Sequence, residues 1–177
     1  MDPLSIPPEV EAVFHNFLTC EFTTLGRQGM PVTWPVLPIF WAERGQFIIM
    51  TSIGLPQKAL NVRREPRVSL LFSSSTGSGL DHPPAVLVQG EAEAPDKVLV
   101  SPDDFGPELT EMMKPQILKL VKNQPSMGLY LMNPVTRYLM DWYFIRLMIT
   151  VTPKRIEWWP RGDFSRRPLS LEAAYVG

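Results

Sequence analysis

Apolar residues near the N-terminus recur with the period of an α-helix. They fall at i, i+3, i+4, i+7 and i+8 and are Val10, Val13, Phe14, Phe17 and Leu18. Pro7 and Pro8 precede them, and proline is well tolerated at the start of a helix. The pattern therefore predicts an amphipathic first helix.

Most of the remaining chain shows short apolar or alternating runs that are separated by turn residues, as β-strands do. The clearest run, 67–73, alternates Val68, Leu70 and Phe72 with more polar positions. The predicted strands are 21–25, 31–41, 47–51, 67–73, 85–94, 143–151 and 155–159. Hairpins outnumber strand–helix–strand units in this order, which favours a closed or nearly closed antiparallel barrel.

Two helical regions interrupt the strands. A short helix over 56–64 should end at Glu65, because a residue that precedes proline is disfavoured in the α conformation. A helical insertion is predicted over about 103–140, with Asp103 and Asp104 as caps, Pro115 as a kink or break, and a second short helix over 133–140. The predicted fold class is thus mainly β (α+β), in one domain over residues 1–177.

Composition narrows the functional classes. The chain has 177 residues, a formal charge of −1 and one cysteine. The near-neutral charge argues against a nucleic-acid partner, and a single cysteine forms no intrachain disulfide. The longest apolar run, 143–151, contains Arg146 and is too short to cross a membrane. Without a recognisable signal peptide, a cytoplasmic location is expected.

Common catalytic constellations are missing from the sequence. The two histidines, His15 and His82, are far apart and do not match a zinc-site spacing, so no metal site is predicted. Ser78 lacks the glycine frame of a nucleophile elbow, because Thr76 stands where the first glycine would be. No catalytic residue is assigned.

The strongest candidate site is the hinge between the strand at 47–51 and the next helix. Thr51, Ser52 and Gly54 lead into this helix, and Lys58 lies in its first turn. Unpaired N–H groups at a helix start favour anions, and a lysine there adds positive charge. The hinge is therefore predicted to hold a phosphate, although a solvated lysine is the alternative interpretation.

Several motifs occur in an order that resembles a known superfamily. They are Gly29-Met-Pro31, Met50-Thr-Ser52, Lys58 with Asn61, the segment 64–72, Val88-Gln-Gly-Glu-Ala92 and the C-terminal segment 141–160. Together they resemble the flavin-binding split barrels of the pyridoxamine 5'-phosphate oxidase-like superfamily over most of the chain. This resemblance implies a six-stranded antiparallel split β-barrel with flanking helices. It also implies a symmetric homodimer, with cofactors at the interface.

The resemblance assigns roles to individual residues. Lys58 would contact the cofactor phosphate, with Thr51 and Ser52 beside it and Asn61 facing the same site. Other cofactor-binding positions would be Thr33, Trp34, Pro35 and Val36 along the isoalloxazine edge, Gln57 before the lysine, and Trp159 near the ring. Apart from the resemblance, Arg63, Arg64 and Arg161 are expected to be available for further anionic groups.

Departures from the oxidase pattern shape the functional prediction. Gln57 and Trp34 occupy positions where the oxidases have arginine, Ala85 replaces a glutamine, and 161–167 lacks the Arg-x-His motif for pyridoxal phosphate. Pyridoxamine 5'-phosphate oxidase activity is accordingly not expected. The segment around Thr33 instead resembles reductases that use FMN or the 8-hydroxy-5-deazaflavin coenzyme.

Three functions stay open at this point. The first is an oxidoreductase that reduces a small unsaturated or quinone-like substrate with FMN or deazaflavin. The second is a non-catalytic carrier of flavin, deazaflavin or haem. The third is a small barrel that binds oligonucleotides or apolar ligands. Simpler structural roles also compete: Trp34 and Trp159 as packing residues, Asn61 and Gln57 as exposed helix residues, and Arg161, Arg166 and Arg167 as a solvated tail.

Overall fold

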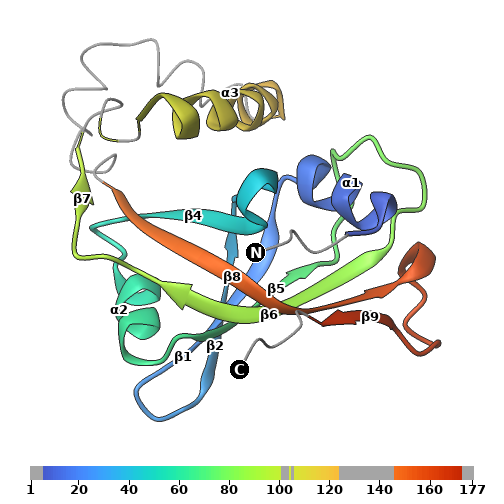
Figure 1. The fold of residues 1–177 in the computed structure, drawn as a ribbon, viewed down its shortest axis with the longest axis horizontal. Coiled ribbons are helices and arrows are strands. Elements are labelled where there is room, and N and C mark those ends of the chain that lie inside the picture. The colour runs from blue at the N-terminus through green and yellow to red at the C-terminus, as the bar shows by residue number, and fades with distance from the viewer. Residues whose placement is uncertain (1–5, 101–103, 105, 124–145, 173–177) are drawn as a thin grey trace.

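The computed structural model describes residues 6–100, 104, 106–123 and 146–172 (Figure 1). Within these ranges the helices are α1 (Pro8–Asn16), α2 (Gln57–Arg64) and α3 (Gly106–Asn123), with the 3-10 turns η1 (Ala42–Arg44) and η3 (Pro160–Gly162). The strands are β1 (Cys20–Leu25), β2 (Pro31–Val36), β3 (Pro38–Trp41), β4 (Gln46–Ser52), β5 (Arg67–Phe72), β6 (Ala85–Glu93), β7 (Val98–Leu99), β8 (Arg146–Trp159) and β9 (Leu169–Glu172).

All strand pairs in the sheet are antiparallel, and its main path runs β2-β1-β5-β6-β8-β4-β3. The short strands β7 and β9 also pair with β8. Strands β2 and β3 lie at opposite ends of this path, yet Leu37 alone separates them in the chain. The sheet must therefore curl until its two ends meet. This confirms the predicted α+β class and the antiparallel split barrel.

The barrel interior is filled by the inward-facing residues of each strand and by the first helix. On α1, the predicted apolar stripe is buried at Val10, Val13 and Phe14. The Phe14 ring meets the Phe47 ring edge-on at a centroid distance of 4.8 Å and lies 5.2 Å from that of Phe72. Aromatic side chains bury large apolar areas, so α1 packs into the barrel and contributes to its hydrophobic core.

The two predicted C-terminal strands are one continuous strand, so the prediction of a break near Pro153 is wrong. Strand β8 carries Pro153 at a register shift opposite Gly90 of β6. Proline lacks the N–H that a regular ladder needs, and such a shift accommodates it. A Cβ on Gly90 would lie 2.3 Å from the Thr152 carbonyl oxygen, so only glycine allows the two strands to approach here.

Two further boundaries differ from the predictions. The predicted strand 31–41 is divided at Leu37 into β2 and β3, which pair with different neighbours. The C-terminal segment is not simply a solvated tail, because β9 pairs with β8. Arg166 forms an ion pair of 3.0 Å with Asp163, and hydrogen bonds from Ser165 hold the pKa of Asp163 below its ordinary value.

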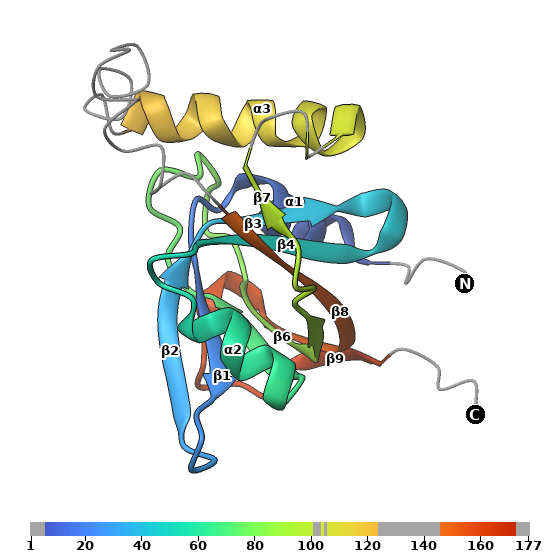
Figure 2. The same ribbon diagram turned by 90° about the vertical axis from the view of Figure 1, so that its left-hand side faces the viewer.

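The insertion contributes α3, which lies on the other side of the sheet from α2 (Figures 1 and 2). This helix continues through Pro115 and is not divided there. The Asp104 carboxylate accepts a hydrogen bond of 2.8 Å from the Val100 N–H. The predictions for Asp103, the helix at 133–140 and the start of the strand at 143 lie outside the described residues. Among the described helices, none is long and apolar enough to cross a membrane.

Candidate functional site

The turn between β4 and α2 is built by the two hydroxyl residues that end the strand. Thr51 is buried, and its hydroxyl donates a hydrogen bond of 3.0 Å to the Leu55 carbonyl. The Ser52 Oγ accepts one of 3.2 Å from the Gly54 N–H, and the Ser52 carbonyl accepts one of 3.0 Å from the Leu55 N–H. These bonds fix the path of the chain into the first turn of α2. The Ser52 hydroxyl proton remains a possible donor to a ligand.

Lys58 and Trp34, both predicted to bind the cofactor, lie next to each other beside this turn. The Lys58 Nζ lies 5.3 Å from the centroid of the Trp34 ring, within range of a cation–π contact. Trp34 is half-buried and packs against the main core. Burial lowers the pKa of Lys58 from its ordinary value. Within the described part of the chain Lys58 forms no ion pair, so a nearby anion would counter its desolvation.

Asn61 is fully buried and joins α2 to β1. Its side-chain oxygen accepts hydrogen bonds of 2.7 Å from Gln57 and 3.0 Å from Arg64. Its amide donates one of 2.9 Å to the hydroxyl of Thr24, which is also fully buried. The interpretation of Asn61 as an exposed helix residue is therefore wrong. The Gln57 amide, on an exposed residue, is directed toward Asn61.

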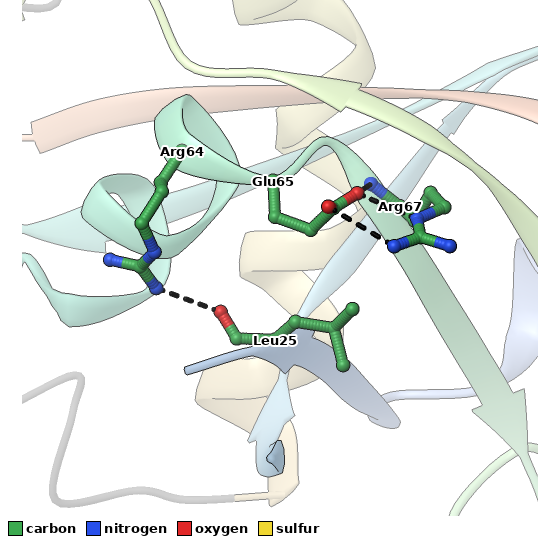
Figure 3. Close-up of polar contacts among 4 residues, drawn as sticks. All are labelled: Leu25, Arg64, Glu65 and Arg67. Atoms are coloured by element: carbon green, nitrogen blue, oxygen red, sulfur yellow. Dashed lines mark hydrogen bonds and ion pairs between the residues drawn. The ribbon is translucent and has the colours of Figure 1, made fainter. Parts of the chain in front are cut away.

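The two arginines at the end of α2 are engaged by the protein itself, contrary to their predicted availability for anionic groups. Arg64 donates 2.9 Å to the Leu25 carbonyl, while the neighbouring Glu65 pairs with Arg67 (Figure 3). Arg63 donates to the Ala94 and Pro95 carbonyls and to the Asp96 carboxylate. Helix α2 is thus anchored at its C-terminal end, and Lys58 stands at the other end.

The remaining predicted residues of β2 divide between its two faces. Trp34 lies opposite Phe22 and Val36 opposite Cys20, so both face the barrel interior. Thr33 and Pro35 are exposed on the outer face, where the hydroxyls of Thr33 and Thr23 lie 2.8 Å apart. Since β2 ends the sheet path, its outer edge has no partner strand among the described residues.

Trp159 lies away from the other predicted residues in this chain. Ser52 pairs with Arg146 at the first position of β8, whereas Trp159 is the last residue of this strand. At about 3.3 Å per residue, the strand between them measures roughly 40 Å along its path. Figure 1 shows α2 and η3 on opposite sides of the molecule. The Trp159 ring lies 5.1 Å from that of Phe164.

An open groove of about 380 Å³ lies between the C-terminal half of α2 and residues 92–95, and Lys58 does not line it. Its lining residues are Val62, Arg63, Pro66, Ala92, Glu93, Ala94 and Pro95. None of the predicted cofactor-binding residues lines it. The hydrogen bonds of Arg63 to the 94–96 segment form one wall of this groove.

Other reactive groups in the described residues do not form a catalytic centre. Cys20 is buried, and this burial raises the pKa of its thiol well above the ordinary value, which disfavours the nucleophilic thiolate. The described residues contain no group of three or more His, Cys, Asp or Glu side chains that could hold a metal ion. Trp158 is 7% exposed, and its indole N–H has no partner in the described structure.

Sequence reasoning missed two residues that shape this region. Thr24 is the buried partner of Asn61, and the Phe164 ring packs against that of Trp159 in a tilted arrangement. The alternation of β1 could have indicated Thr24, because it follows Cys20 and Phe22 at inward-facing positions. A polar residue at such a position requires a buried hydrogen-bond partner. Phe164 had no comparable signal, since its place depends on the turn after β8.

No protein-family model and no curated protein matches the sequence. Solved structures do match. A haem-binding protein from Mycobacterium smegmatis has a TM-score of 0.53 at 16% identity, and the match covers 96% of this chain and 60% of that one. A conserved hypothetical protein from Mycobacterium tuberculosis has a TM-score of 0.53 at 20% identity, covering 98% and 97%.

A third structure is a protein from Clostridium acetobutylicum related to general stress protein 26, of the pyridoxinephosphate oxidase family. Its TM-score is 0.54 at 8% identity, with 93% of this chain and 92% of that chain covered. Likeness at such low identity establishes the fold. The sequence resemblance is thereby confirmed at the level of the fold.

Proposed function

We propose that this pyridoxamine 5'-phosphate oxidase-like split barrel binds a planar redox cofactor that carries a phosphate, either FMN or the 8-hydroxy-5-deazaflavin coenzyme. We further propose that it uses this cofactor to reduce a small unsaturated or quinone-like substrate. The observation that carries the proposal is the half-buried Lys58, which lies against Trp34 at the start of α2.

The residues at this position suit a phosphate. Lys58 supplies a cation that lacks an ion-pair partner among the described residues, and its lowered pKa shows the cost of keeping that charge in a partly buried place. The first N–H groups of α2 and the Ser52 hydroxyl can add hydrogen bonds. With Gln57 turned toward Asn61, the contact to a phosphate is a point charge and not a bidentate arginine pair.

Little further chemistry is required of the side chains. A flavin or deazaflavin ring supplies the hydride transfer when it is bound. The protein must hold the ring, orient it and keep water away. Trp34 offers an aromatic surface directly beside the cation, and the Asn61 network fixes the helix that carries Lys58.

We also propose that the complete site forms between two copies of the chain. Lys58 follows the end of β4 that pairs with the first residue of β8, whereas Trp159 is the last residue of β8, so one cofactor would contact both if two copies of the chain supplied them. Around the hinge, Ile53, Leu55 and Leu60 are exposed to 37%, 59% and 44%. Apolar side chains gathered at one site are typical of an interface.

Absorption spectroscopy and binding titration test the proposal. Purified protein should bind FMN or the deazaflavin coenzyme, and Lys58→Ala should weaken that binding at least tenfold. The matched control is Lys114→Ala, which removes an exposed lysine on α3, on the other side of the sheet. Equal loss in both variants, or no binding by the wild type, would contradict the proposal. Sedimentation of the holoprotein should show a dimer, and a monomeric holoprotein would contradict the interface.

A carrier of the same cofactors or of haem is the second candidate. It is favoured by the Mycobacterium smegmatis neighbour, which is named as a haem-binding protein. A titration with hemin, followed in the Soret region, separates haem from flavin binding. Oxidation of added reduced cofactor by quinones would indicate a reductase, whereas tight binding without turnover would indicate a carrier.

A further inference from the structure

A second hydrophobic cluster lies on the outer face of the sheet, beneath α3. Its buried members are Ile39, Trp41, Ile48 and Leu109. Four methionines pack against them and are only partly buried, namely Met50, Met112, Met113 and Met148. We call these four the methionine cluster. It includes four of the five methionines in the described part of the chain, the fifth being Met30.

The methionines form both sides of one contact. Met50 and Met148 are paired residues on β4 and β8, so their side chains stand next to each other on the outer face. On α3, Leu109, Met112 and Met113 fall at i, i+3 and i+4 and therefore share one helix face. The helix thus rests on the sheet largely through thioether side chains.

Among the described residues, one ion pair also joins α3 to the rest of the chain. An ion pair between Arg44 and Glu108 joins α3 to η1, but its atoms are 3.9 Å apart and both side chains are more than half exposed. Exposed pairs of this kind contribute little to stability. Among the described side chains, Leu109 and the methionine cluster therefore provide the main contact between α3 and the sheet.

We propose that the methionine cluster is a site of reversible oxidation by hydrogen peroxide, and that its oxidation releases α3 from the sheet. The thioether sulfur attacks one peroxide oxygen, an S–O bond forms, the O–O bond breaks and water leaves. Each sulfur loses two electrons and the peroxide gains them. The resulting sulfoxide is polar and disrupts apolar contacts, and methionine sulfoxide reductases reverse it.

The exposure of the methionines supports oxidation at this cluster. Each of the four methionine side chains is partly exposed, so the cluster is open to a small oxidant in the folded protein. Met30, in the β1–β2 turn, is 64% exposed and lies outside the cluster. It should react faster than the cluster and have no effect on α3.

Hydrogen–deuterium exchange of the full-length protein tests the proposal, combined with peptide mass analysis of sulfoxide at each methionine. After peroxide treatment that oxidises the cluster, amide exchange in 107–123 should accelerate at least tenfold, while exchange in β6 stays unchanged. Treatment with methionine sulfoxide reductases should restore the original rate. Met30→Leu should respond as the wild type does.

The matched control replaces all four cluster methionines by leucine (M50L/M112L/M113L/M148L) and keeps every other methionine. In this variant α3 should stay protected, and peroxide should not change its exchange although Met30 is oxidised. Unchanged α3 exchange in wild-type protein with a fully oxidised cluster would overturn the proposal. An equal response of the leucine variant to peroxide would overturn it as well.

Discussion

The hydrogen-bond network around Asn61 gives the sharpest prediction for stability. Asn61→Ala removes three side-chain bonds at once, those with Gln57, Arg64 and Thr24. Gln57 and Arg64 are exposed and can bond to water instead, so the loss of each costs at most about 0.5 kcal/mol. The Thr24 hydroxyl is fully buried, and leaving it without this partner costs about 1–3 kcal/mol. The expected loss in the free energy of unfolding is therefore about 1–4 kcal/mol.

Equilibrium unfolding in urea measures this loss. The denaturant slope should stay constant, because the change affects one contact and leaves the overall surface exposed on unfolding unaltered. Gln57→Ala is the matched control, since it removes one exposed partner of the same network. It should cost about 0.5 kcal/mol or less.

A double variant separates the hydrogen bond from simple packing. Replacing both buried partners with apolar residues, in Thr24→Val/Asn61→Leu, should cost at least about 1 kcal/mol less than the sum of the single changes. The reasoning is refuted if Asn61→Ala costs no more than Gln57→Ala. Strict additivity of the two buried changes would also refute it.

Three further predictions address other parts of the fold. Gly90→Ala should lower the free energy of unfolding by at least about 2 kcal/mol in thermal or urea unfolding, because its Cβ would meet the Thr152 carbonyl oxygen at 2.3 Å; a neutral change would show that β6 and β8 separate easily there. Cys20 should react with a thiol reagent only as fast as the protein unfolds, since its thiol is buried and its pKa raised; rapid reaction in native protein would contradict this burial. Lys58→Met should raise the free energy of unfolding at pH 7 in the cofactor-free protein. The pKa of Lys58 is lower in the folded than in the unfolded state, so burial of the charged lysine destabilises the fold fully at any pH below the folded-state pKa. This destabilisation is relieved as the pH rises toward the unfolded-state pKa of about 10.4. If the stability gained by Lys58→Met did not shrink at high pH, the partial burial of a charged Lys58 would be contradicted.

Sequence patterns predicted the local elements well where one physical rule dominated. The stripe on α1 and the stop before Pro66 at the end of α2 follow directly from helix period and proline geometry. The break expected near Pro153 did not occur, because Gly90 on another strand accommodates the proline. That compensation is a tertiary contact, so no local pattern could reveal it.

The candidate site shows the same limit. Lys58 and Trp34, which the resemblance assigned separately to the phosphate and to the ring edge, lie next to each other. Asn61 turned inward to Thr24, and Trp159 lies at the far end of β8. Both outcomes depend on how the sheet curls. The curl brings Asn61 next to Thr24, more than thirty positions away in the sequence. It also places Trp159 away from the residues with which the family resemblance had grouped it.

The most direct test of the phosphate assignment compares FMN with riboflavin, which lacks the phosphate, in wild-type protein and in Lys58→Ala. A charge-assisted contact is worth about 1.5–3 kcal/mol, so wild-type protein should bind FMN roughly 10–100 times more tightly than riboflavin. In Lys58→Ala this ratio should fall toward one, while riboflavin affinity stays nearly constant. An unchanged ratio in Lys58→Ala would contradict the claim that the hinge after β4 holds the cofactor phosphate.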